Sequence, residues 1–98
     1  MDIKWLQDFV CLGRTNNFTR AAEERNITQP AFSRRIKSLE NWLGIPLVKR
    51  STYPVELSEA GEMFLPVAQE TINNLSDARQ NIRGAEFGRT AFQRIAVL

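Results

Sequence analysis

The sequence contains no histidine and only one cysteine, Cys11. A single cysteine cannot form a disulfide within the chain, and without histidine it cannot complete a cysteine–histidine zinc site. The nucleophile–base pairs that serve many hydrolases usually include the same missing histidine. We therefore predict no catalytic residue, no metal site and no cofactor, and we expect a reducing compartment such as the cytoplasm.

Long apolar runs are also missing. The hydrophobic stretches are only a few residues long, far below the about 20 residues that a membrane-spanning helix needs. The first residues include Asp2 and Asp8 and have neither the basic start nor the apolar run of a signal peptide. With 43% hydrophobic and 24% charged residues, the composition is that of a folded chain. We expect one small domain with room for an extension, and no membrane association.

Charge is modest overall but unevenly distributed along the chain. The net charge is only +2. Residues 14–50 carry eight arginines and lysines against three glutamates, whereas residues 55–98 carry four arginines against six acidic residues. A basic first half is typical of a surface that meets a polyanion such as nucleic acid. On charge alone, a chance asymmetry explains these numbers equally well.

Helical spacing and capping residues predict three helices in the basic half. They cover residues 2–14, 19–25 and 28–43. We expect Thr19 and Thr28 to be the N-caps of the second and third helices, and Gly44 to end the third. Ala21 and Ala22 are small enough to let another helix approach closely. A short helix, a tight turn and a second helix with a polar outer side form the layout of a helix-turn-helix.

The third predicted helix has two distinct faces. Its apolar stripe consists of Phe32, Ile36, Leu39 and Leu43. The side chains that we expect to contact DNA, on this helix and on the segment after it, are Thr28, Gln29, Pro30, Ser33, Arg34, Arg35, Lys37, Lys49, Arg50 and Tyr53. The amide of Gln29 suits an adenine edge, Pro30 can rest on a thymine methyl, and Arg34 can reach guanine or phosphate. The helix N-terminus adds free N–H groups and positive potential.

These side chains also have plainer interpretations. Gln29 is an ordinary residue for a helix start, and a pair such as Arg34 and Arg35 often forms only a solvated face. The prediction therefore depends on the combination, because the candidates gather at one helix end. A winged-helix module that binds protein and never contacts DNA is the alternative, and an apolar recognition face would mark it.

Other charged and polar residues are expected to be structural. We expect Arg20 and Arg25 to be surface charges paired with the neighbouring glutamates of the second helix. Glu40 is expected to be structural, with Lys37 as a partner. Cys11 lies in an apolar helical pattern, which favours a buried, inert thiol over a redox-active one.

Residues 47–57 predict two short strands around a turn at 51–54, which places a two-stranded wing directly after the third helix. Ser58 then caps a long helix at residues 59–86, with Pro66 inside it. Apolar and small residues recur along this helix at alternating spacings of four and three. They are Phe64, Ala68, Thr71, Leu75, Ala78 and Ile82. Heptad spacing favours pairing with a second copy, a homodimer, and the alternative is that the helix folds back on its own domain.

The last residues, 92–98, are typical of a β-strand, which cannot stand alone. We therefore expect the chain to lead into a further domain. The predicted organisation is a winged helix-turn-helix domain at residues 1–58, a dimerisation helix at 59–88 and the start of another domain at 89–98.

Two stretches carry a family resemblance, FTRAAEERNITQPAFSRRIKSLENWLGIPLVKR and LSEAGEMFLPVA. They resemble the LysR-type transcriptional regulators, and the resemblance covers about residues 3–90. It implies a mainly α fold, in which a winged helix-turn-helix is followed by a linker helix that pairs with a second subunit. It also implies a bacterial, cytoplasmic homodimer, tetrameric when complete, that binds an interrupted palindrome of double-stranded DNA. A small-molecule or redox inducer would bind the following effector domain.

The same resemblance implies which residues contact DNA. They are those matching Gln29, Pro30, Ser33 and Arg34, with Arg50 along the wing. The sequence departs from the family pattern at Arg25, where leucine is usual. The wing residues 51–56 lack the usual arginine and glycine, and Glu56 adds a charge that repels phosphate. Tyr53 is then the wing side chain expected at the sugar–phosphate edge, and the expected function is sequence-specific DNA binding in transcription control.

Overall fold

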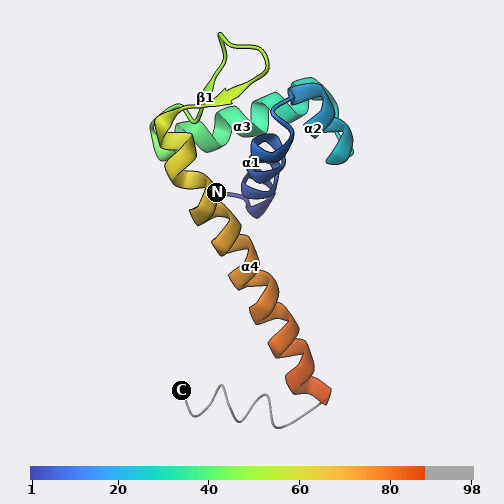
Figure 1. The fold of residues 1–98 in the computed structure, drawn as a ribbon. Helices are drawn as coiled ribbons and strands as arrows, with labels where there is room; N and C mark the ends of the chain where they lie inside the picture. Colours follow the sequence, from blue (N-terminus) through green and yellow to red (C-terminus); the bar gives the residue numbers. More distant parts are fainter. Residues whose placement is uncertain (88–98) are drawn as a thin grey trace.

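The computed structural model describes residues 1–87 as three short helices, a two-stranded hairpin and one long helix (Figure 1). In chain order the elements are α1 (Ile3–Thr15), α2 (Phe18–Glu24), α3 (Gln29–Leu43), β1 (Val48–Lys49), β2 (Glu56–Leu57) and α4 (Glu59–Phe87). The predicted mainly helical winged fold is confirmed. The strand predicted at residues 92–98 lies outside the described residues. None of the helices between residues 1 and 87 has both the length and the apolar character of a membrane span.

Local capping explains where the first helix begins and ends. The side chain of Asp2 accepts a hydrogen bond from the backbone N–H of Lys4 at 2.9 Å, and α1 starts there. It ends at Asn16, which adopts the left-handed conformation with φ 53°. Gly13 lies inside α1, two residues before the helix ends. A Cβ at this glycine would lie only 3.0 Å from the Leu65 side chain, so Gly13 allows α4 to approach α1 closely.

The start of the second helix differs from the prediction. Asn17, and not Thr19, is the N-cap, because its side-chain oxygen accepts a hydrogen bond from the N–H of Arg20 at 3.0 Å. Phe18 therefore becomes the first residue of α2. Its ring meets the ring of Phe32 edge-on, with centroids 5.9 Å apart, and this contact joins α2 to α3.

The third helix follows its predicted limits. Thr28 caps it by accepting a hydrogen bond from the N–H of Ala31 at 3.3 Å, and Gly44 ends it with φ 81°. The expected apolar stripe faces the core, where Phe32, Ile36 and Leu39 are fully buried and Leu43 is partly buried. Burial of this stripe sets the rotation of α3, so that the opposite edge of its first turns faces solvent.

The core forms where α1 packs against the other three helices. Phe9 and Leu12 of α1 are fully buried, and the small residues Ala21 and Ala22 of α2 pack beside them. Both alanines are buried, which is consistent with the expected approach of a neighbouring helix.

The wing is an antiparallel hairpin tied to the rest of the domain at both ends. Val48 lies opposite Leu57 in the ladder, and the N–H of Val55 donates to the carbonyl of Asn16 at 3.2 Å. The hydroxyl of Ser58 donates to the carbonyl of Pro46 at 2.7 Å and accepts from the N–H of Gly61 at 3.1 Å. Ser58 thus caps α4, as expected, and anchors it beside the wing.

The long helix divides into two parts. In Figure 1 it leaves the helical cluster on the side away from the wing. Its first half packs on α1: Phe64 lies 5.9 Å from Phe9 between ring centroids, and Ala68 is fully buried. Ala68, expected to face a second copy, is instead covered within the same chain, whereas Phe64 is only partly buried and keeps an open side. Farther along, Leu75 and Ile82 are 55% and 60% exposed.

Candidate nucleic-acid interface

A shallow groove runs along the exposed edge of α3. Its lining residues are Gln29, Pro30, Ser33, Arg34, Lys37 and Arg50. The first five share one edge because their spacings of three and four residues correspond to one helical turn. Six of the ten residues predicted from the sequence are thus brought together on a single surface.

The groove combines hydrogen-bonding groups with positive charge. Gln29 and Pro30 are exposed at the N-terminus of α3, where backbone N–H groups and the helix dipole favour an anion. Arg34 and Lys37 are also exposed, and within residues 1–87 neither forms an ion pair. Both cations are therefore available to phosphates or base edges.

Arg50 reaches the groove from the wing and is held in place by two contacts. Its Nη2 donates to the carboxylate of Glu40 at 2.9 Å, and its guanidinium lies 5.4 Å from the ring centroid of Phe18. The side chain is still 41% exposed. Arg50 is thus a positioned cation, in contrast to the long free side chains of Arg34 and Lys37.

Glu40 is the residue that organises this end of the site. It is buried, and its Oε2 accepts from the backbone N–H groups of Leu47 at 2.7 Å and Val48 at 3.3 Å. Its predicted structural role is confirmed, but its ion-pair partner is Arg50 and not Lys37. A buried carboxylate requires several donors, and the chain reversal after α3 supplies them from the start of the wing.

Two arginines predicted for other roles are turned inward. Arg35 Nη1 lies 3.3 Å from Asp8 Oδ2, and Arg25 Nε lies 2.7 Å from Asp8 Oδ1. Arg35, predicted to contact DNA, does not line the groove of α3 and is paired with Asp8. Arg25 is not paired with the glutamates of α2 either, whereas Arg20 does lie 4.0 Å from Glu24. Sequence reasoning missed Asp8 because its partners are 17 and 27 residues away.

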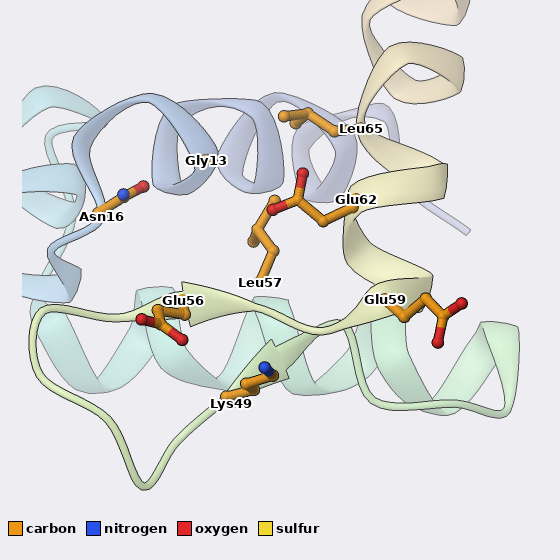
Figure 2. A pocket seen from close by; sticks show the side chains of 8 residues that line it. All are labelled: Gly13, Asn16, Lys49, Glu56, Leu57, Glu59, Glu62 and Leu65. Carbon is orange, nitrogen blue, oxygen red and sulfur yellow. The ribbon is translucent and has the colours of Figure 1, made fainter.

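Three other predicted contacts lie outside the groove. Thr28 is an exposed cap, and Tyr53 is 87% exposed near the tip of the wing. Lys49 faces a second pocket, between α1, the wing and α4 (Figure 2). That pocket is lined by Gly13, Asn16, Lys49, Glu56, Leu57, Glu59, Glu62 and Leu65. Its three carboxylates would repel phosphates, so it forms no extension of the basic groove.

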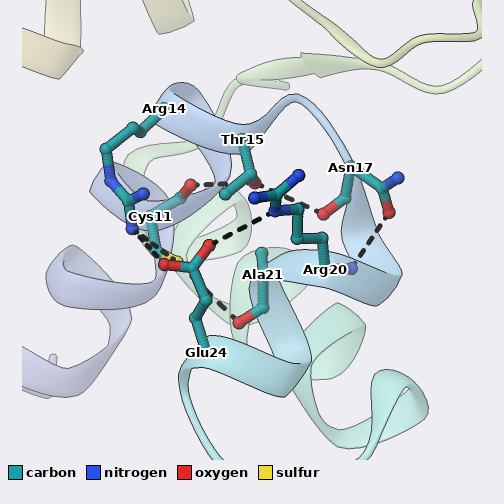
Figure 3. Close-up of polar contacts among 7 residues, drawn as sticks. All are labelled: Cys11, Arg14, Thr15, Asn17, Arg20, Ala21 and Glu24. Carbon is teal, nitrogen blue, oxygen red and sulfur yellow. Dashed lines mark hydrogen bonds and ion pairs between the residues drawn. The ribbon is translucent and has the colours of Figure 1, made fainter.

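Cys11 is buried at the contact between α1 and α2 (Figure 3). Its thiol donates to the carbonyl of Ala21 at 3.8 Å, and Arg14 bridges it to Glu24, whose carboxylate lies 2.7 Å from Arg14 Nη2. Burial, followed by the nearby charge of Glu24, raises the pKa of the Cys11 thiol. A protonated, buried thiol is a poor nucleophile, which supports the interpretation of Cys11 as inert.

The sequence is similar to known bacterial regulators. A family model described as bacterial regulatory helix-turn-helix protein, lysR family, matches residues 3–62. The regulator YjiE of Escherichia coli strain K12 is 40% identical over 84 residues, which is 86% of this chain and 28% of YjiE. The regulator YxjO of Bacillus subtilis strain 168 is 35% identical over 97 residues, which is 99% of this chain and 33% of YxjO. The chain thus spans about a third or less of these two relatives.

Two solved structures resemble this fold closely. Vibrio fischeri DarR in complex with DNA superposes with a TM-score of 0.86 at 42% identity, over 88% of this chain and 30% of DarR. The BenM DNA-binding domain in complex with catB site 1 DNA superposes with a TM-score of 0.87 at 31% identity, over 91% of this chain and 96% of that domain.

Proposed function

This chain belongs to the LysR family of bacterial regulatory helix-turn-helix proteins, and from that membership we propose that its α3 helix reads double-stranded DNA through the major groove. The observation that carries the proposal is the groove in which Gln29, Ser33 and Arg34 are displayed beside two further cations. The DNA complexes of the similar DarR and BenM domains support it. The polar character of this edge disfavours the alternative of a protein-binding module.

The proposed mechanism separates affinity from sequence preference. Arg34, Lys37 and Arg50 displace counterions from phosphates, and this supplies most of the affinity. Gln29 would read an adenine edge, Pro30 would rest on a thymine methyl, and Arg34 can add a guanine contact. Tyr53, exposed at the tip of the wing, would contact the sugar–phosphate edge outside the major groove.

We further propose that α4 joins two copies into a homodimer. Beyond the part of α4 that α1 covers, Leu75, Ala78 and Ile82 are exposed, and they continue the heptad spacing. A second copy would cover this apolar edge and present two α3 helices to the two half-sites of an interrupted palindrome.

The proposed organisation of the whole regulator follows from this dimer. Residues 1–58 would read DNA in the cytoplasm, residues 59–88 would hold the dimer, and residues 89–98 would begin an effector-binding domain. Such an effector-binding domain would take a small-molecule or redox inducer and would join dimers into a tetramer.

Removing single side chains from the groove is expected to separate the contribution to affinity from the contribution to sequence preference. Arg34→Ala should weaken binding to both the selected and the scrambled duplex, by about 1–3 kcal/mol on the selected one. Gln29→Ala should instead reduce the preference for a duplex selected by the wild-type chain over a scrambled one. Binding isotherms on both duplexes measure these effects. An unchanged preference in Gln29→Ala would refute the reading role of this side chain.

The dimer is tested by placing charge on the exposed apolar edge of α4. Leu75→Glu should raise the dimer dissociation constant by about a hundredfold, because dimerisation would bury an unpaired carboxylate. Gln80→Glu, on the opposite side of the heptad spacing, is the matched control and should leave dimerisation nearly unchanged. Analytical ultracentrifugation across a dilution series measures both. A wild-type chain that sediments as a monomer throughout would contradict the dimer.

A further inference from the structure

Asp8 is a buried carboxylate that connects three helices. It lies on α1, its side chain is fully buried, and each of its two oxygens contacts a different arginine. Arg25, at the C-terminal end of α2, donates to Oδ1 at 2.7 Å, and Arg35, on α3, donates to Oδ2 at 3.3 Å. The carboxylate thus fixes the relative placement of the helices that form the helix-turn-helix.

Both arginines are held at Asp8 by the cost of leaving its carboxylate unpaired. A buried carboxylate without counter-charges costs several kcal/mol, so removal of either arginine from Asp8 is unfavourable. Arg25 is held further by Gln7, whose side-chain oxygen accepts from Arg25 Nη2 at 3.1 Å. Arg35 is only 29% exposed, although it lies on the helix that carries the basic groove.

The adjacent residues Arg34 and Arg35 of α3 therefore lie in different surroundings, one in the exposed groove and one against α1. Successive residues of a helix point about 100° apart. Arg34 lines the groove with Gln29 and Ser33, whereas Arg35 turns toward α1 and ends on Asp8. Without the carboxylate, nothing else among the ion pairs of residues 1–87 would retain Arg35 on that side.

We propose that Asp8 is a positioning residue for DNA recognition: it withholds Arg35 from the DNA and fixes the setting of α3, so that Arg34 is the arginine of this pair that reaches the duplex. This inference rests on the proposed function, since it concerns how α3 is presented to DNA. In this proposal Arg35 helps to orient α3 and so contributes to sequence preference, and it does not bind phosphate.

The salt dependence of DNA binding distinguishes an Arg35 that binds phosphate from an Arg35 that only positions α3. The double variant Asp8→Asn/Arg35→Gln removes one negative and one positive charge, so the net charge is unchanged. It also removes the buried carboxylate together with its partner on α3, so that neither charge is left alone. Its plot of log affinity against log salt concentration should keep the wild-type slope, whereas Arg34→Gln should make the slope shallower by about 0.9 for each bound subunit. An equal loss of slope in the double variant would show that Arg35 contacts phosphate and would overturn the proposal.

Sequence preference supplies the second readout. The ratio of dissociation constants for a scrambled duplex and a wild-type-selected duplex should fall about tenfold in the double variant, because α3 loses its setting against α1. This ratio does not depend on the fraction of folded protein, so a loss of stability alone would leave it unchanged. A wild-type ratio in the double variant would overturn the positioning role.

A measurement on the unmodified chain covers the case in which the double variant does not fold. In nitrogen-15 NMR spectra, the guanidinium signals of Arg35 should stay in place when the selected duplex is added, whereas those of Arg34 should shift. Comparable shifts for both arginines would overturn the proposal.

If the wild-type chain shows no preference between the duplexes, the proposed function itself fails. If wild type and Arg34→Gln behave as expected and only the Arg35 results do not, this inference alone fails.

Discussion

Gly61→Ala is expected to lower the free energy of unfolding by about 3 kcal/mol, near the upper end for overpacking a core. Gly61 is buried in the first turns of α4, and an added Cβ would overlap the carbonyl oxygen of Leu47 and lie 3.1 Å from the Cβ of Leu57. The overlapped atom belongs to the backbone, and the same carbonyl accepts the N–H of Ser58 at 2.9 Å. It cannot move without disturbing the junction between the wing and α4.

The measurement is thermal unfolding followed by circular dichroism, with an expected fall in Tm of roughly 12–24 °C for a domain of this size. Gly84→Ala is the matched control. It lies in the same helix with nothing within 4 Å of its added Cβ, so it should hold or raise helix stability. Equal melting temperatures for wild type and Gly61→Ala would show that α4 does not pack against the wing as described.

Glu40→Ala is expected to cost about 3 kcal/mol of stability and to weaken DNA binding as well. The substitution removes the acceptor for two backbone N–H groups, those of Leu47 and Val48, and the partner of Arg50. The first loss leaves buried donors unsatisfied at the start of the wing. The second releases Arg50 from its place beside α3.

Urea denaturation and binding isotherms measure the two consequences separately. Glu40→Gln should show a smaller loss of stability, because its amide oxygen can still accept from the backbone, although its NH2 group cannot pair with Arg50. Glu62→Ala, which removes an exposed carboxylate, is the control and should change stability by about 0.5 kcal/mol at most. A Glu40→Ala variant with the wild-type urea midpoint would contradict the role assigned to this carboxylate.

The features that could be predicted from the sequence are those determined within a few residues. Thr28 and Gly44 bound α3 through local capping and a left-handed turn, and both were identified from residue type and spacing. The exposed edge of α3 follows from the same local logic, because burial of Phe32 and Ile36 leaves the opposite edge outside. Residue type alone does not fix the cap of α2, because Asn17 and Thr19 are both good capping residues, and the packing of Phe18 on Phe32 favours the earlier start.

The features that could not be predicted depend on contacts across the fold. A carboxylate in α1 does not show in the sequence which distant arginine it will hold, and Arg34 and Arg35 are indistinguishable as residue types. Only the packing of α1 against α3 separates them. In the same way, a heptad pattern shows that α4 has an apolar edge but not what covers it. The structure has α1 covering Ala68 and leaves Leu75 exposed.

The most direct test of a DNA-reading edge on α3 is to map the backbone amide shifts of the nitrogen-15-labelled chain as a selected duplex is added. We expect the largest shifts at residues 28–37 and in the wing, and a marked reduction of these shifts when the salt concentration is raised. Shifts confined to the exposed residues Trp42 and Ile45 or to α4, with residues 28–34 unchanged, would contradict it.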